Sequence, residues 1–486
     1  MEFQSGIFLA FFAALLAVYH NLPSRAKPWL LLAANAVFYA AGGVQWLPLL
    51  AAAVVISWAA ALAMDRIAAR PARLALLWGC VVLFVGQLFY FKYFSALLRG
   101  LFDYRLQIIA PLGVSFYSFT ILGYIIDVYC RTQPAEKNLV RYAAFVSMFA
   151  QITSGPIERG SNMLPQLAAP RPYSFEQLAQ GLSRALWGFY KKFVLANMLA
   201  NMVGAVYGDV ESFSGPFLLL ASLLYSYQLY LDFGGYSDIA IGMMQALGYD
   251  VMENFRRPFA ARSYTQLWDR WHISLTSWFR DYVFTPLTFS IRGVGGRTGK
   301  WLGWLSIFII FPLSGVWHGA GLGFLVWGVL NGVFMVVGKM TAKKRRKWAK
   351  KNPLYRSRFV KAFIQCGIVY LLFTACIVFF RAESMGQALQ IWAGFGRGWA
   401  ETLLSPAAIV AGLKAMGIGR VAILVVGGGS LAVELCEWAA EKKGQTMGAW
   451  LHGLRAPARW AAYYAQLLLL AFYGVLGQSS FIYRQF

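Results

Sequence analysis

Long apolar runs separated by short basic clusters limit what this chain can fold into. A helix that crosses a membrane needs about 20 apolar residues, because the hydrocarbon core of a bilayer is about 30 Å thick. Many stretches of the sequence approach that length. We expect membrane spans near residues 3–21, 29–41, 46–64, 74–91, 107–126, 193–207, 216–231, 301–317, 322–338, 359–380, 421–435 and 460–475.

The composition agrees with a membrane protein. Hydrophobic residues make up 59% of the chain and charged residues only 13%, whereas a soluble chain carries about 25% charged residues. Several apolar runs are short, and residues 139–152 are followed directly by a Thr-Ser-Gly-Pro sequence. Such segments are tolerated at membrane depth where they are buried in protein or line a wet cavity. We predict an all-α, polytopic fold with about eleven membrane helices, plus re-entrant and interfacial amphipathic helices.

The basic residues predict the orientation of the chain. The net charge is +24, and Lys and Arg fall in clusters between apolar runs, which is the pattern of cytoplasmic loops. This distribution argues against nucleic-acid binding. The densest cluster, Lys339–Lys361, has eleven basic residues and no acidic one, and we expect a cytoplasmic loop that touches anionic headgroups of the membrane lipid. No repeat or linker divides the sequence, so one membrane domain is expected over residues 1–486.

His318 is the first candidate for chemistry. It follows one apolar segment and precedes another, and the basic clusters on both sides belong to the cytoplasm. This pattern predicts the tip of a hairpin deep in the membrane, where an ionisable residue is costly and usually functional. Helix packing among the nearby glycines is the alternative. A buried, neutral imidazole could act as a general base that takes the proton of a hydroxyl attacking a thioester carbonyl.

His272 is the second candidate. Residues 263–282 predict one amphipathic helix lying flat on the cytoplasmic side, with Ser263 and Gln266 as a capping box at its start. His272 falls on the apolar face, so a structural histidine bonded to a neighbour explains it at least as well as catalysis. The other residues of that face are Trp268, Trp271, Leu275, Trp278, Phe279 and Tyr282.

Other chemistries find little support. The sequence has no Gly-x-Ser-x-Gly elbow, and no His-Glu-x-x-His motif or Walker A loop. The five cysteines are scattered, so neither a disulfide framework nor a metal site is predicted, and no bound cofactor is expected. Asp232 and Asp238 interrupt an apolar stretch. Pairing with Arg or capping of half-helices is the favoured role for these two residues, and substrate binding is the alternative.

A series of short motifs runs in a fixed order along most of the chain. They are Pro111–Tyr117, Tyr124–Tyr129, Ser154–Ile157, Leu231–Asp238, Trp271–Leu275, Arg280–Tyr282, Trp317–Ala320 and Phe379–Glu383. Together they resemble the membrane-bound O-acyltransferase family, in the bacterial branch that contains the alginate O-acetyltransferase membrane subunit. The resemblance implies a helical fold with a central funnel, a catalytic role for His318, and the family's second histidine at His272. The same motifs imply substrate contacts at Trp317, Trp271, Arg280, Asp281, Asp232 and Asp238.

The resemblance also implies an activity. Members move an acyl group from a cytoplasmic donor toward an acceptor across the membrane, usually with a partner enzyme outside it. For this chain we expect an inner-membrane enzyme, an acetyl-CoA or other acyl-thioester donor, and an extracytoplasmic glycan or relay protein as acceptor. Asp269-Arg270 and Pro286-Leu-Thr288 depart from the alginate-type pattern.

Three alternatives stay open at this point. One is D-alanyl transfer to teichoic acid or O-acetylation of peptidoglycan by the same fold. The second is a transporter without acyl chemistry, although no inverted repeat is visible. The third is a structural subunit that only recruits a secreted partner.

Overall fold

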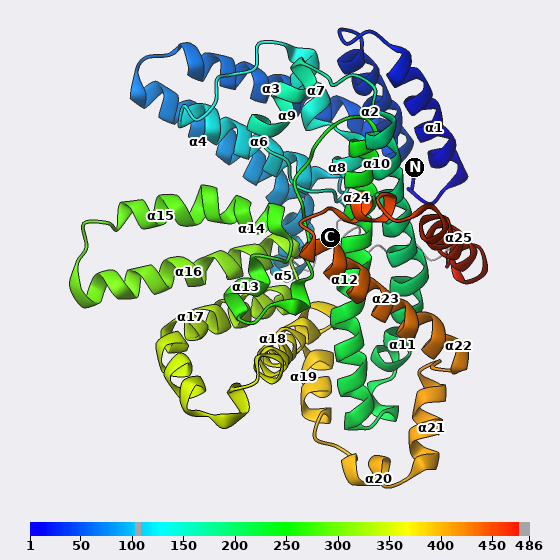
Figure 1. Ribbon diagram of the computed structural model, residues 1–486. Helices are drawn as coiled ribbons and strands as arrows, with labels where there is room; N and C mark the ends of the chain where they lie inside the picture. The colour runs from blue at the N-terminus through cyan, green and yellow to red at the C-terminus, as the bar shows by residue number, and fades with distance from the viewer. Residues whose placement is uncertain (103–107, 476–486) are drawn as a thin grey trace.

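The structure, a computed structural model, describes residues 1–102 and 108–475, and these residues form helices and connecting loops without any strand (Figure 1). The all-helical prediction is confirmed. The first helices are α1 Gly6–Asn21, α2 Lys27–Gly43, α3 Leu47–Arg66, α4 Arg70–Phe89, α5 Ser95–Phe102, α6 Val114–Tyr129, α7 Leu139–Val146, α8 Phe149–Ile152, α9 Gly160–Ala168, α10 Phe175–Phe189, α11 Asn197–Gly208 and α12 Gly215–Ala246. The later ones are α13 Tyr264–Trp268, α14 Ile273–Phe279, α15 Thr285–Ser290, α16 Gly296–His318, α17 Leu322–Lys351, α18 Arg358–Arg381, α19 Met385–Gly394, α20 Trp399–Leu403, α21 Pro406–Ala415, α22 Arg420–Ala422, α23 Gly429–Lys442, α24 Met447–His452 and α25 Ala456–Tyr473.

Many of these helices are suited to a membrane. Among the described residues, six helical segments are long and apolar enough to cross one: Lys27–Arg66, Arg70–Arg99, Gly296–His318, Leu322–Lys351, Arg358–Arg381 and Arg420–Lys442. Shorter apolar helices cover Gly6–Asn21, Val114–Tyr129, Leu139–Ile152 and Pro406–Ala415. The multi-pass prediction is therefore confirmed, while the total of about eleven spans stays a prediction.

Helix α12 runs through the middle of the protein beside α10 (Figure 1). It is continuous for 32 residues, so the alternative in which the two aspartates cap half-helices is wrong, and the helix continues beyond the predicted end of the span at residue 231. The helix tolerates these acids because each finds a basic partner inside the protein. Helix α10 was absent from the predicted spans, because its polar residues lie among the apolar ones and no long apolar run marks it.

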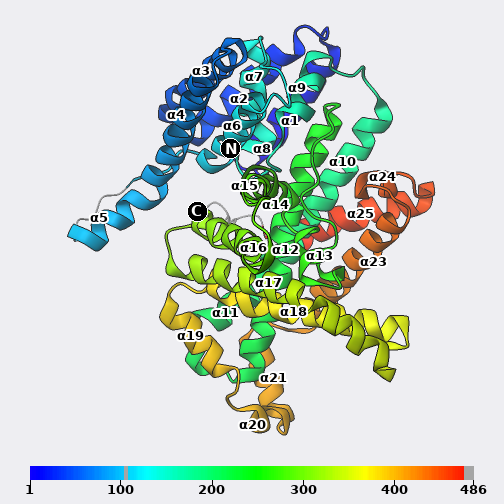
Figure 2. The same cartoon turned by 90° about the vertical axis from the view of Figure 1, so that its left-hand side faces the viewer.

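Helices α16 and α17 form the predicted hairpin, and α18 packs beside α17 (Figure 2). Residues 319–321 connect the two helices, and His318 is the last residue of α16. The helices meet at two glycines. A Cβ atom on Gly315 would lie 2.3 Å from the Phe324 carbonyl oxygen, and one on Gly328 would lie 2.4 Å from the Phe311 oxygen. The helices therefore touch through their backbones just before His318.

Two predicted segments differ from the structure. The expected single helix over residues 263–282 is divided into α13, α14 and a π-helical turn, η6, at Arg280–Phe284. The Ser263 hydroxyl does cap α13, by accepting from the Gln266 N–H at 3.2 Å. The segment is packed inside the protein and does not lie flat on its surface, since Trp268, Trp271 and Trp278 are buried. The predicted loop at Lys339–Lys361 is helical as far as Lys351.

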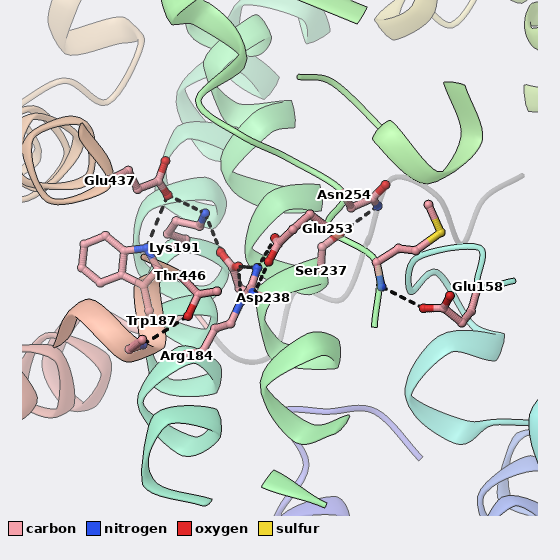
Figure 3. A network of polar contacts seen from close by, with 12 residues as sticks. Glu158, Arg184, Trp187, Lys191, Ser237, Asp238, Glu253, Asn254, Glu437 and Thr446 are labelled. Atoms are coloured by element: carbon pink, nitrogen blue, oxygen red, sulfur yellow. Dashed lines mark hydrogen bonds and ion pairs between the residues drawn. The ribbon is translucent and has the colours of Figure 1, made fainter. Parts of the chain in front are cut away.

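A buried network of ion pairs joins α10, α12 and α23 (Figure 3). Arg184 on α10 contacts Asp238 of α12 at 2.9 Å and Glu253 at 2.6 Å. Lys191, in the π-helical turn η3 at Tyr190–Ala196, contacts the other Asp238 oxygen at 2.7 Å. Lys191 also reaches Glu437 of α23 at 2.9 Å. Each charge thus faces opposite charges, which offsets the cost of removing it from water.

Asp232 lies on the same helix, α12, on the N-terminal side of Asp238. It is 2% exposed and forms an ion pair with Lys192, the residue after Lys191. The favoured sequence interpretation, pairing with Arg, is therefore confirmed for Asp238, which contacts Arg184, whereas Asp232 pairs with a lysine instead.

We expect Asp238→Asn to destabilise the protein, because it leaves Arg184 and Lys191 with fewer compensating charges. Breaking a buried ion pair costs roughly 3–5 kcal/mol. The variant should give less monodisperse protein and a lower unfolding temperature in detergent. Asp250→Asn is the control, since Asp250 pairs with Arg171 at the surface, where both side chains are about half exposed. Normal yield and unfolding of Asp238→Asn, combined with lost activity, would contradict the structural role.

We expect Gly315→Ala to weaken the α16–α17 hairpin. The added methyl group collides with the Phe324 backbone, and such overpacking typically costs about 1–3 kcal/mol. Gly303→Ala, on the same helix, is the matched control, because a Cβ there meets no atom within 4 Å. It should leave the unfolding temperature unchanged or raise it, since Ala favours helix over Gly. Equal unfolding temperatures of the two variants would show that the close contact at Gly315 contributes little to the stability of the protein.

Candidate active site

The two candidate histidines lie close to the same tryptophan. The ring centroid of Trp317 is 4.8 Å from that of His318 and 6.3 Å from that of His272. Both imidazoles are 2% exposed. His318 also contacts Trp327 of α17 and Phe380 of α18, each at 5.2 Å. The fold therefore brings together two histidines that are far apart in the sequence.

The Asn254 side chain fixes the orientation of His272. Nδ1 of the imidazole lies 3.0 Å from the Asn254 carboxamide oxygen, which also accepts from the Ser274 hydroxyl at 3.0 Å. The Asn254 amide donates to Ser237 at 3.0 Å (Figure 3). Because a carboxamide oxygen only accepts, Nδ1 of His272 carries the proton and the lone pair of the neutral ring is on Nε2. Burial lowers the pKa of His272 to about 3, which keeps the ring neutral.

The backbone of His272 is strained. Its φ is 44° and its ψ is 52°, in the left-handed region, which costs a residue other than glycine about 1–3 kcal/mol. This conformation breaks the predicted helix just before α14. The Asn254 carbonyl accepts from the next N–H, that of Ile273, at 2.9 Å. Asn254 therefore holds both the side chain of His272 and the backbone beside it, and strain of this kind is concentrated at functional sites.

A cavity of about 780 Å³ lies close to the end of α16, and neither candidate histidine is among the described residues that line it. Gly319 and Ala320, which directly follow His318, form part of its wall, together with Lys92 and Lys192. Further polar groups in the wall come from Glu2, Gln4, Gln45, Ser115, Thr153, Ser154 and Tyr236. The cavity is large enough for a sugar-sized or thioester-bearing group, and it is bounded by the chain immediately after the predicted catalytic residue.

The predicted substrate-binding residues fall into separate groups. Trp317 stacks on Phe119 with ring centroids 5.3 Å apart, and Trp271 packs against Phe373 at 4.8 Å. Both tryptophans are buried in the aromatic cluster around the histidines.

Four acidic or basic residues predicted to bind substrate lie elsewhere. Arg280 and Asp281 pair with each other at 3.0 Å, both partly exposed, and neither is among the described residues that line the cavity. Asp238 is held in the ion-pair network. Asp232 meets the cavity indirectly, through its partner Lys192.

Two residues at the site were missed by the sequence analysis. Asn254 gave no signal, because a single asparagine in a loop has no distinctive spacing. Lys92 did give a signal in the sequence, because it is the basic residue within an aromatic run, Phe89–Phe94, at the end of an apolar segment. In the structure its ammonium group donates to the Trp317 carbonyl oxygen at 2.6 Å.

Comparison with known proteins agrees with this arrangement. Residues 131–380 match the model of the membrane-bound O-acyltransferase family, and this range includes both histidines. A probable alginate O-acetylase of Pseudomonas putida is 33% identical over 405 residues, which cover 81% of this chain and 79% of the relative. A peptidoglycan O-acetyltransferase of Helicobacter pylori is 29% identical over 422 residues, covering 80% and 76%.

A teichoic acid D-alanyltransferase of Streptococcus thermophilus is also similar, with 30% identity over 278 residues that cover 54% of this chain and 67% of the relative. The match to the alginate-type relative covers 81% of this chain, compared with 54% for the match to the D-alanyltransferase. The helical fold, the membrane spans and these similarities lead to one conclusion: this chain is a multi-pass membrane protein that belongs to the membrane-bound O-acyltransferase family.

Proposed function

We propose that this acyltransferase lies in the inner membrane and moves an acetyl group from a cytoplasmic acyl thioester, such as acetyl-CoA, toward an extracytoplasmic polysaccharide. The acceptor of the acyl group is a hydroxyl of the polymer itself or of a relay protein outside the membrane. The main support for the proposal is the placement of His318, at the tip of the α16–α17 hairpin and immediately before Gly319 and Ala320, which line a large cavity. The relatives named as probable alginate O-acetylases support acetyl as the acyl group.

His318 acts as the general base in this proposal. Its neutral imidazole accepts the proton of the acceptor hydroxyl as the hydroxyl oxygen attacks the thioester carbonyl carbon. The C–S bond then breaks, and the proton passes from His318 to the departing thiolate, which leaves as a thiol. No covalent enzyme intermediate is needed. His272, fixed by Asn254, orients the donor or the acceptor against His318.

Two related activities use the same chemistry. D-Alanyl transfer and peptidoglycan O-acetylation are the activities in the names of the other relatives. A transporter without acyl chemistry belongs to a different class of protein. Incubation of the purified protein with a radiolabelled acyl thioester distinguishes a transporter from an acyltransferase. Label transferred to a hydroxyl acceptor supports the proposal, whereas passage of the donor without transfer contradicts it.

We expect His318→Gln to abolish acyl transfer. Glutamine is polar and close in size but cannot accept the proton, and general-base catalysis contributes roughly 10²- to 10⁴-fold in rate. The measurement is turnover by the purified, monodisperse variant in nanodiscs. His452→Gln, at the last residue of α24, is the control and should retain activity. Near-normal turnover of His318→Gln would remove this residue from the mechanism.

We expect His272→Ala to reduce activity less than His318→Ala does, because an orienting residue assists the reaction without carrying the proton. His272→Asn is a useful companion, since asparagine tolerates the left-handed backbone at this position better than most residues. It should therefore fold better than His272→Ala and separate backbone strain from lost imidazole chemistry. Equal losses in well-folded His272 and His318 variants would mean that both rings take part directly.

A further inference from the structure

Lys92 has an ionisable side chain in an unusual place. It belongs to the candidate membrane span Arg70–Arg99, within a π-helical turn, η2, at Tyr90–Phe94. The buried lysines of the network, Lys191 and Lys192, pair with carboxylates, but within residues 1–102 and 108–475 no carboxylate forms an ion pair with Lys92. A charge on a membrane span without a countercharge is costly, and such residues usually serve substrate or ion chemistry.

The contacts of Lys92 place it at the catalytic hairpin. Its Nζ donates to the carbonyl oxygen of Trp317 at 2.6 Å and lies 5.0 Å from the centroid of the Trp317 ring. Trp317 is the residue immediately before His318. Lys92 also lines the cavity together with Gly319 and Ala320, the two residues immediately after His318. The ammonium group is therefore at the cavity wall, beside the backbone that carries the proposed base.

An ammonium group has three N–H donors. The Trp317 carbonyl accepts one, which fixes the position of the charge, and the others remain for a group inside the cavity. A hydroxyl that gives its proton to His318 must lie within hydrogen-bonding distance of that ring. The thioester carbonyl that it attacks must lie about 3–3.5 Å from the hydroxyl oxygen. The reacting carbonyl therefore comes to the same end of the cavity as Lys92.

We propose that the ammonium group of Lys92 stabilises the oxyanion that forms on the thioester carbonyl during acyl transfer. This inference rests on the proposed function. As the hydroxyl oxygen bonds to the carbonyl carbon, the electron pair of the C=O double bond moves to oxygen and the proton goes to His318. The negative oxygen then faces Lys92. When the double bond re-forms, the C–S bond breaks and the thiolate takes the proton from His318, so Lys92 ends unchanged.

Two substitutions test this role. Lys92→Met keeps the length of the side chain but removes the charge and the donors. Lys92→Gln also removes the charge but keeps an N–H donor for the Trp317 carbonyl. Removing one oxyanion donor typically lowers kcat by about 10²- to 10³-fold, and we expect both variants to show a loss of this size. KM for donor and acceptor should stay unchanged, because the ground-state substrates lack the oxyanion. Lys300→Met, at the exposed start of α16, is the matched control.

A second measurement reports the oxyanion directly. A phosphonate analogue of the acyl donor carries a tetrahedral, negatively charged centre that mimics the intermediate. It should bind both Lys92 variants more weakly than the unsubstituted protein, by a factor similar to the loss in kcat/KM. Binding is measured on the folded, monodisperse fraction, so a lower yield of one variant does not affect the result.

Several outcomes would overturn the inference. Full activity of Lys92→Gln beside an inactive Lys92→Met would mean that the lysine only holds the Trp317 backbone. A raised KM for the acceptor with unchanged kcat would assign Lys92 to acceptor binding. Unchanged phosphonate affinity would exclude a role at the oxyanion. If Lys92→Met turned over normally while His318→Gln was inactive, the role of Lys92 would be wrong and the proposed function would stand. If His318→Gln was active, the general-base mechanism on which this inference rests would be wrong.

Discussion

Charged and polar groups removed from water must find partners inside the protein, and this requirement organises the structure. Removing an unpaired charge from water costs several kcal/mol even after the protein relaxes. Arg184, Lys191, Asp238 and Glu437 meet this requirement together and connect α10, α12 and α23 in doing so. The same rule explains why α12 can continue through two aspartates. It also draws attention to Lys92, which bonds a carbonyl and faces a cavity.

The proposed site combines a rigid hairpin with a strained segment. Backbone contact at Gly315 and Gly328 holds α16 against α17, so the position of His318 depends on helix packing. His272 depends instead on Asn254, which bonds its ring and the backbone next to it. Trp317 packs close to both rings. A base on a rigid helix and a second imidazole in a fixed tautomer suit a reaction in which a hydroxyl must be aligned with a thioester.

Much of the architecture could be predicted from the sequence, because apolar runs of membrane length leave few alternatives to helices. The α16–α17 hairpin, the buried tryptophans near His272 and the cap at Ser263 follow from local patterns. The break before α14 could not be foreseen, because the helical spacing of Trp268, Trp271 and Leu275 continues across it. The left-handed backbone of His272 depends on Asn254, a contact between segments that the sequence alone does not bring together. The pairing partners of Asp232 and Asp238 were hidden for the same reason, since α10 has no long apolar run.

The π-helical turns have a consequence for how this chain can vary. A π turn fits one extra residue into a helix, and such turns are frequent at functional sites. One of them carries Lys92, and another carries Lys191 and Lys192. Because the turn absorbs the extra residue locally, deleting a single residue from Tyr90–Phe94 would convert it to a regular α-helical turn, and the two parts of this span would keep their packing. Relatives that differ in length at this turn would present a different side chain to the cavity. Such insertions and deletions would let acceptor preference diverge while the α16–α17 hairpin stays intact.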